Sequence, residues 1–214
     1  MTKIGILGSG DVGKTLAKGF LKYDYQVMVG SDHPQKLKEF KNENPKVEAA
    51  SFEQSAQWAD LLVLCVKGTV AEKVVEKTKK HLSGKIVVDT TNPIADAPPD
   101  NGVLKFFTSL EESLMERLQK IAPDAQFVKA LNSIGSGLMI NPDFGGGIKP
   151  TMFICGNNDN AKMKVSGILQ KFGFEIEDVG KVESARAIEP LCILWCIPGF
   201  LKNEWTHAFM LLKK

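Results

Sequence analysis

A glycine cluster near the amino terminus has the residue types and spacing to bind a diphosphate. Gly8, Gly10 and Gly13 follow the short apolar run KIGIL and precede a segment with helical periodicity. In such a strand–turn–helix the first glycine permits a tight turn, the second lets the backbone approach a pyrophosphate, and the third lets the helix pack closely on the sheet. Unpaired N–H groups at the helix start favour an anion there. The predicted diphosphate loop comprises Gly8, Ser9, Gly10, Asp11, Val12 and Gly13; the alternative is a glycine-rich turn without a ligand.

A second polar group follows the next apolar run, QVMVG, and could contact an adenosine ribose. Asp32 lies 19 residues beyond Gly13, close to the separation at which dinucleotide-binding folds carry an acidic residue for the ribose hydroxyls. A carboxylate there favours NAD and repels the 2′-phosphate of NADP. Ser31, His33 and Lys36 beside it favour a phosphate, so the choice between NAD and NADP stays open. Alternatively, Asp32 is only a turn residue.

The elements that must position these residues alternate between strand and helix patterns. Strands are predicted at residues 3–7, 26–29, 47–50, 60–66, 85–88, 126–131, 151–155 and 174–178. Helices are predicted between them, among others at 35–42, 70–81, 109–121 with Ser109 as cap, 159–172, and 184–212 with an interruption at Pro198. The unbroken apolar run DLLVLCV is typical of a strand buried on both faces. The order predicts a Rossmann-type α/β fold, a doubly wound and mainly parallel sheet with a short C-terminal helical extension.

The length of 214 residues limits how the chain divides. We predict a dinucleotide-binding domain over residues 1–180 and a helical extension over 181–214 that serves substrate binding or dimerisation. An extension this short cannot enclose a substrate alone, so the acceptor site is expected to be an open cleft or a pocket completed by a second subunit. Residues 132–150, rich in Gly, Asn and Pro, form a loop long enough to suggest a function.

Composition narrows the class of protein and its partners. Lys and Arg total 27 and Asp and Glu total 25, a net charge of +2, which argues against a nucleic-acid partner. With no signal-peptide pattern and no 18-residue uncharged apolar run, we expect a cytoplasmic protein without a membrane partner. The four cysteines are expected to be reduced core thiols, and no metal site is predicted.

The motifs together resemble a known family across essentially the whole chain. The chain is similar to the short dinucleotide-binding oxidoreductases typified by the NADPH-dependent reductase of the deazaflavin coenzyme F(420), and more distantly to the cytosolic domain of the STEAP ferric reductases. The segments that carry the resemblance are GSGDVGKTLAKGF, VMVGSDHPQKL, KIVVDTTNPI, VKALNSIGSGLMINP, FICGNNDNAK and ARAIEPLCILW.

The resemblance implies a nicotinamide cofactor, NADP or NAD, and a homodimer formed through the C-terminal helices. It assigns the diphosphate to Ser9, Gly10, Asp11 and Val12, and the ribose and 2′-phosphate to Ser31, Asp32 and Lys36. A loop that covers the cofactor would comprise Val66, Lys67 and Gly68. The two sides of the nicotinamide would be formed by Asn92 and Pro93 and by Ala130, Leu131 and Asn132. In NADP-specific members the position of Asp32 is often Arg, so Asp32 does not certify NADP.

Hydride transfer makes few demands on side chains, because the cofactor carries the chemistry. The expected function is hydride transfer between a nicotinamide and a flavin- or deazaflavin-like, or small organic, acceptor. No catalytic side chain is assigned; Asn132 and then Asn92 are the nearest candidates, and both residues are alternatively turn formers. Two other functions stay open: a non-catalytic NAD(P)-binding redox sensor, and a small imine or carbonyl reductase, which would need a proton donor.

Overall fold

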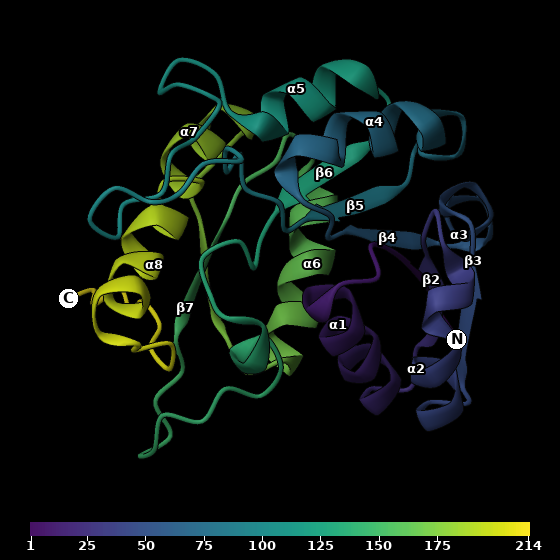
Figure 1. Ribbon diagram of the computed structural model, residues 1–214, viewed down its shortest axis with the longest axis horizontal. Helices are drawn as coiled ribbons and strands as arrows, with labels where there is room; N and C mark the ends of the chain where they lie inside the picture. Colours follow the sequence, from purple (N-terminus) through teal and green to yellow (C-terminus); the bar gives the residue numbers. More distant parts are fainter.

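A computed structural model describes residues 1–214, and its centre is a six-stranded parallel sheet (Figure 1). The strand order is β3-β2-β1-β4-β5-β6, the order of the dinucleotide-binding Rossmann fold. The strands are β1 (Lys3–Leu7), β2 (Gln26–Gly30), β3 (Val47–Ala50), β4 (Leu61–Leu64), β5 (Ile86–Asp89) and β6 (Gln126–Lys129). The predicted doubly wound α/β fold is therefore confirmed.

Helices cover both faces of this sheet, as the unbroken apolar strands require. One face packs against α1 (Asp11–Lys22), α2 (Lys38–Glu43) and α6 (Asp159–Lys171), and the other against α3 (Phe52–Trp58), α4 (Gly68–Thr78) and α5 (Leu114–Ile121). Successive residues of a strand point to opposite faces, so Val88 of β5 joins the first core and Val87 joins the second. Burial on both faces explains why the polar residues collect at the strand ends.

The carboxyl ends of the central strands meet at one edge of the sheet. Leu7 is aligned with Gly30 and with Leu64, Leu64 with Asp89, and Asp89 with Lys129. Segments that leave these five strand ends therefore lie side by side. Open α/β folds bind ligands outside this edge, at the point where the strand order reverses. Here the reversal lies between β1 and β4.

A second, two-stranded sheet is attached beyond β6. Its strands β7 (Thr151–Ile154) and β8 (Glu175–Asp178) are parallel and are connected through α6. An isolated antiparallel bridge between Lys129 and Cys155 joins β6 to the end of β7. Short 3-10 helices complete the secondary structure at Pro34–Leu37, Lys79–His81, Ser136–Leu138 and Val182–Ser184. The strand predicted near 174–178 is confirmed.

The start predicted for α5 is wrong, because Ser113 rather than Ser109 caps that helix. The Ser113 hydroxyl accepts the backbone N–H of Glu116, and the Glu116 carboxylate accepts the Ser113 N–H at 2.8 Å. This reciprocal arrangement satisfies two backbone donors at the helix start. Ser109 instead lies in a turn that is closed by a bridge to Glu112.

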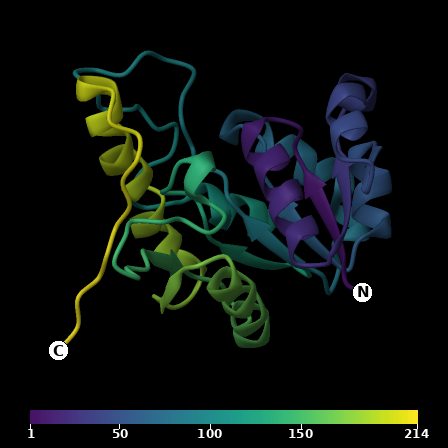
Figure 2. The same ribbon diagram turned by 90° about the horizontal axis from the view of Figure 1, so that it is seen from below.

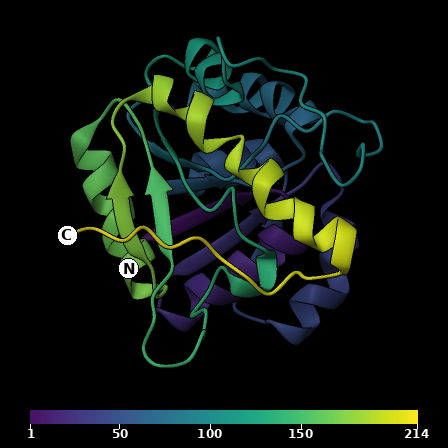
Figure 3. The same cartoon turned by 90° about the vertical axis from the view of Figure 1, so that its left-hand side faces the viewer.

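The C-terminal extension is helical only as far as Lys202. Helix α7 (Ala185–Ile188) is followed by α8 (Leu191–Lys202), which ends where Asn203 adopts a left-handed conformation with φ 56°. The interruption predicted at Pro198 is wrong, because α8 continues through this residue. The last residues, 203–214, return in an extended conformation beside β7, where the Thr151 N–H donates to the Phe209 carbonyl at 2.9 Å (Figure 3). The prediction of helix up to 212 is wrong for this segment, which instead contacts β7 through this bond and through the Leu211 N–H, which donates to the Thr151 hydroxyl at 2.9 Å.

One helical run meets the length and composition criteria for a membrane span. It comprises Val182–Lys202, with a mean hydropathy of 1.3 in its most apolar window, of which 39% is buried in this structure. The run includes the charged residues Glu183, Arg186 and Glu189, so it differs from the uncharged run sought in the sequence, and the absence of a membrane partner stays a prediction. The buried side of the run includes Ala185, Ile188 and Trp195, and Figure 2 shows α8 lying along one end of the domain.

Candidate functional site

The turn between β1 and α1 can exist only with glycine at two of its positions. Gly8 has φ +143°, and a Cβ on it would lie 2.5 Å from the Cys65 carbonyl oxygen. A Cβ on Gly13 would lie 2.1 Å from the Gly8 carbonyl oxygen. Both contacts are far shorter than any non-bonded approach of carbon to oxygen, so larger residues would push α1 off the strand. The roles predicted for Gly8 and Gly13 in the turn and in helix packing agree with this geometry.

Gly10 differs from its two neighbours in the motif, because it faces open space. A Cβ on Gly10 would meet no atom within 4 Å. Gly10 is the N-cap of α1 and provides no side-chain cap, and the backbone N–H groups of residues 9–13 have no hydrogen-bond partner within the protein. These donors and the positive end of the helix dipole point out of the carboxyl edge of the sheet. The arrangement can bind a diphosphate that lies against the backbone.

Two serines join the ends of β1 and β2 beside this turn. The hydroxyl oxygens of Ser9 and Ser31 are 3.1 Å apart, and the His33 N–H donates to the Ser31 hydroxyl at 3.1 Å. Ser31 is buried, whereas His33 and Lys36 are exposed. Lys36 forms no ion pair, so its ammonium is free to meet a ligand phosphate.

Asp32 points away from the two serines and toward α4. Its carboxylate lies 2.7 Å from the Lys77 ammonium, which is also 3.4 Å from the Glu53 carboxylate. The hydrogen bond to Asp32 raises the pKa of the Lys77 ammonium above its ordinary value. Sequence inspection missed Lys77, because the contact joins residues that lie far apart in the chain. The negative charge expected of Asp32 at the ribose site is therefore partly neutralised.

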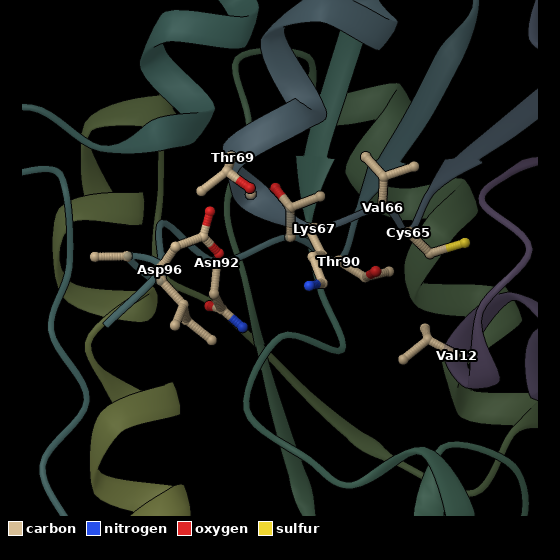
Figure 4. Close-up of a pocket in the computed structure, with 12 residues that line it drawn as sticks. Val12, Cys65, Val66, Lys67, Thr69, Thr90, Asn92 and Asp96 are labelled. Atoms are coloured by element: carbon tan, nitrogen blue, oxygen red, sulfur yellow. The ribbon is translucent and has the colours of Figure 1, made fainter. Parts of the chain in front are cut away.

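A pocket of about 300 Å³ opens next to the diphosphate loop, between the loops that follow β4 and β5 (Figure 4). It is lined by Val12, Cys65, Val66, Lys67, Gly68, Thr69, Thr90, Thr91, Asn92, Ile94, Ala95 and Asp96. Of the predicted site residues, Val12, the covering loop and Asn92 thus meet in one cavity. The threonines, Ile94 and Asp96 were not predicted. The available signal was the position of Thr90 and Thr91 directly after the end of β5.

Gly68 allows the two loops around this pocket to touch. A Cβ on Gly68 would lie 2.0 Å from the Asn92 carbonyl oxygen, so only glycine permits the observed distance. Pro93 follows Asn92 and is buried. The loop after β4 is therefore held directly against the segment after β5.

The two asparagines predicted near the reacting ring bond to each other. Asn92 donates its side-chain N–H to the Asn132 carbonyl at 2.7 Å, and Asn132 donates to the Asn92 side-chain oxygen at 3.1 Å and to the Ile188 carbonyl at 3.0 Å. Asn132 is buried, and its Oδ1 has no partner. The pair joins the ends of β5 and β6 and the C-terminal extension at one point.

The approach to Asn132 runs through an unusual backbone conformation. Leu131 is buried and has φ +59°, a left-handed conformation that a bulky side chain rarely adopts. Its N–H donates to the Met152 sulfur at 3.1 Å, and the Ala130 N–H donates to the Asp89 carbonyl at 3.0 Å. These contacts turn the chain sharply at the end of β6 and direct Asn132 toward Asn92.

A buried cluster of charges lies behind this pair, and sequence inspection missed it. The Lys129 ammonium lies 2.7 Å from the Asp89 carboxylate and 2.9 Å from the Glu189 carboxylate, and all three side chains are buried. Burial disfavours the charged amine, but the two carboxylates outweigh it and raise the pKa of Lys129 above its ordinary value. The available signal was a single charged residue ending each of the apolar strands IVVD and QFVK.

Comparison with known proteins identifies relatives that are similar to this chain in sequence and in fold. Residues 3–93 match the family model described as NADP oxidoreductase, coenzyme F(420)-dependent. The chain is 25% identical over 201 residues to an F(420)-dependent NADP reductase of Methanocaldococcus jannaschii, covering 88% of each chain. A crystal structure from Arthrobacter sp. FB24, described as a candidate F(420)-dependent NADP reductase, superposes with a TM-score of 0.93 at 28% identity and 100% coverage of both chains. The resemblance inferred from the motifs is confirmed.

The chain is also similar to part of a larger protein. It is 29% identical over 204 residues to the metalloreductase STEAP3 of Rattus norvegicus, which covers 93% of this chain but only 39% of the relative. The chain thus spans about two-fifths of the length of the metalloreductases that it matches.

Replacing Gly10 with valine should prevent nucleotide binding without disturbing the fold. The backbone at Gly10 is extended, with φ −77°, and its Cβ position is empty, so the new side chain would occupy the space of the diphosphate. We expect affinity for NADPH and NADH to fall by roughly ten- to a hundredfold or more, the scale of 1–3 kcal/mol of overpacking, with an unchanged circular dichroism spectrum. Isothermal titration calorimetry measures the affinity.

The matched control for this substitution is Gly167→Val in α6. Gly167 also has no atom within 4 Å of its Cβ position, but α6 lies outside the pocket lining. Gly167→Val should bind nucleotide as the unmodified protein does. Equal affinities for Gly10→Val and Gly167→Val would mean that the glycine turn is not the diphosphate site.

Proposed function

We propose that this protein is an oxidoreductase that binds NADP or NAD and transfers a hydride between the nicotinamide and a flavin- or deazaflavin-like, or small organic, acceptor. The observation that carries the proposal is the placement of free backbone donors at the start of α1 beside the pocket of about 300 Å³. A diphosphate on those donors leaves one half of a dinucleotide facing the pocket and the other half facing Ser9 and Ser31. The family similarity supports the nicotinamide cofactor.

The residues of the site fit this cofactor in three places. The empty Cβ position at Gly10 provides the close approach that a diphosphate needs. Ser31, His33 and Lys36 would contact the ribose and its 2′-phosphate. Val12 and Ile94 provide apolar walls to the pocket, where the nicotinamide ring would lie. When bound in its reduced form, the cofactor supplies the hydride, and the protein sets its orientation.

The ionisable side chains of the pocket favour an acceptor that needs no proton from the protein. Burial raises the pKa of the Cys65 thiol to about 12, so this group stays protonated and is a poor acid at neutral pH. Lys67 and Asp96 are exposed at the rim, and the pocket lining contains no histidine or tyrosine. Reduction of a carbonyl requires a positioned proton donor, whereas a flavin-like ring can exchange its proton with solvent.

The acceptor class can be tested by following the absorbance of reduced nicotinamide. Flavin mononucleotide and a deazaflavin should oxidise NADPH in the presence of the protein, whereas simple ketones and cyclic imines should not. Tight NADPH binding without oxidation by any acceptor would favour the redox-sensor alternative. Oxidation by imines or ketones alone would favour a small imine or carbonyl reductase.

The charge arrangement around Asp32 supports NADP over NAD, although Asp32 is the residue type associated with NAD. Lys77 holds the Asp32 carboxylate at 2.7 Å, which reduces its repulsion of a 2′-phosphate. His33 and Lys36 in the same loop are exposed and can meet the 2′-phosphate. Both members of the Asp32–Lys77 pair are about half exposed, so solvent screens the interaction and its effect on affinity is modest.

Substitution of Lys77 with methionine should shift the coenzyme preference toward NADH. Without the ammonium, Asp32 is free to repel the 2′-phosphate and to accept the ribose hydroxyls of NADH. We expect the ratio of NADPH to NADH affinity to fall by roughly two- to fivefold, the size of an exposed ion-pair interaction. Lys79→Met is the control, because Lys79 pairs only with Glu76 on the same stretch of chain. An unchanged ratio in Lys77→Met would mean that Asp32 does not face the ribose.

A homodimer in the cytoplasm remains the expected assembly and location, from the family resemblance. The exposed apolar side chains of Leu194, Phe200 and Leu201 on α8 support pairing through the C-terminal helices. Sedimentation velocity should then show a particle of twice the 23.5 kDa chain mass, and Leu201→Glu should convert it to a monomer. A monomer for the unmodified chain at micromolar concentration would contradict this pairing.

A further inference from the structure

We propose that Lys129 is a positioning residue for the nicotinamide pocket. Held between Asp89 and Glu189, it fixes the backbone of Thr91 and, through it, the wall of the pocket formed by Asn92. This inference rests on the proposed function, because it names the part of the same site that sets the position of the nicotinamide. Lys129 does not line the pocket, so it acts through the segment that it holds.

Neighbouring strands bring the first two charges together. Asp89 and Lys129 are the last residues of β5 and β6 and are partners in the parallel register. They therefore point to the same face of the sheet, toward α5, and neither is exposed to solvent. The ammonium and carboxylate lie 2.7 Å apart. A lysine in this place has lost its hydration, so its remaining partners determine where its ammonium sits.

Thr91 is bound by this cluster through three of its atoms. The Lys129 ammonium donates to the Thr91 carbonyl at 2.8 Å. The Asp89 carboxylate accepts the Thr91 N–H at 2.9 Å and the Thr91 hydroxyl at 2.7 Å. A residue bound at its amide, its carbonyl and its side chain has little freedom to move. Thr91 lines the pocket directly.

The constraint on Thr91 extends to the rest of the pocket wall. The next residue, Asn92, bonds to Asn132 on one side, and its carbonyl closely approaches the backbone of Gly68 on the other. The loops after β4, β5 and β6 thus meet at Asn92, one residue from the carbonyl that Lys129 holds. A displacement of Thr91 would move the surface on which the nicotinamide ring would lie.

Glu189 connects the same cluster to the C-terminal extension. Its carboxylate lies 2.9 Å from the Lys129 ammonium and accepts the N–H groups of Leu114 and Met115 at 2.9 and 3.0 Å. Those donors form the first turn of α5, whose positive dipole end balances the second carboxylate. The extension is therefore tied to the wall of the pocket, in addition to the ion pair between Arg186 and Glu116.

Stability alone is a weak reason for this cluster. Replacing a buried ion cluster with hydrophobic residues of similar size is often neutral or stabilising, whereas removing one partner is strongly destabilising. What hydrophobic residues cannot reproduce here is a donor directed at the Thr91 carbonyl. The cluster therefore has a separable function, which is to determine the position of that carbonyl.

The test separates position from stability by removing all three charges together. The single variant Lys129→Met leaves two buried carboxylates and is expected to lower the thermal unfolding midpoint. The triple variant Asp89→Asn, Lys129→Met, Glu189→Gln keeps acceptors for Thr91 and for α5 but lacks the donor to the Thr91 carbonyl. We expect its midpoint to return toward that of the unmodified protein, while kcat for NADPH oxidation stays about ten- to a hundredfold low, the cost of a displacement of about 1 Å.

A second readout reports the nicotinamide position without turnover. Adenosine 2′,5′-bisphosphate carries only the adenosine half of NADP, so its affinity should be the same in the triple variant and the unmodified protein. NADPH affinity should fall relative to this fragment in the triple variant only. The control is Lys162→Met, which removes another buried lysine, one that lies 2.8 Å from the carboxylate of Asp178 at the end of β8 and outside the pocket lining. This variant should lower stability but leave kcat and the affinity ratio unchanged.

Recovery of stability together with normal kcat and a normal affinity ratio in the triple variant would overturn the positioning role. If the triple variant does not fold, the double variant Lys129→Met, Glu189→Gln replaces it, because that change keeps the net charge of the cluster and the bonds of Asp89 to Thr91.

Binding of NADPH and NADH by the unmodified protein is measured before any variant is compared. If it binds neither NADPH nor NADH, the proposed function itself fails, an outcome that no comparison between variants can mimic.

Discussion

The contact between the start of α1 and the turn after β1 is the constraint on which the rest of the site depends. Because a Cβ on Gly13 would lie 2.1 Å from the Gly8 carbonyl oxygen, the helix begins directly on the end of the strand. Its unpaired N–H groups are then directed out of the carboxyl edge of the sheet. The pocket and the serines on either side take their position from this edge, since β2 and β4 pair with β1 in parallel register.

The two sides of the site are built by different means. On the side of β2 the charged groups are largely exposed, and solvent screens the contact between Lys77 and Asp32, on which the proposed coenzyme choice depends. On the side of β5 and β6 the polar groups are buried and bonded to one another through Asn92, Asn132 and Lys129. A buried network tolerates few alternative arrangements. It suits the side where the proposed hydride transfer needs a fixed geometry.

The parts of the site that could be predicted from the sequence are those made by local backbone geometry. The glycine motif and the polar residues that end the strands belong to short segments, and parallel pairing brings such strand ends together in any sheet of this kind. The direction of Asp32 and the mutual bonding of Asn92 and Asn132 could not be predicted in this way. Each depends on a side chain whose partner lies on an element distant in sequence.

The sequence by itself determined the order of strands and helices, the doubly wound sheet and the glycine turn after β1, because apolar periodicity and glycine spacing act over a few residues. The capping box of Ser113 and Glu116 is equally local, so the sequence also carried the signal for the start of α5. Only the tertiary structure decided that the last residues leave the helix to lie beside β7 and that Lys129 is buried between two carboxylates. A charged residue at a strand end reads as exposed until its neighbours are known. Its burial is stable only because Asp89, Glu189 and the first turn of α5 converge on it, and that convergence exists in three dimensions alone.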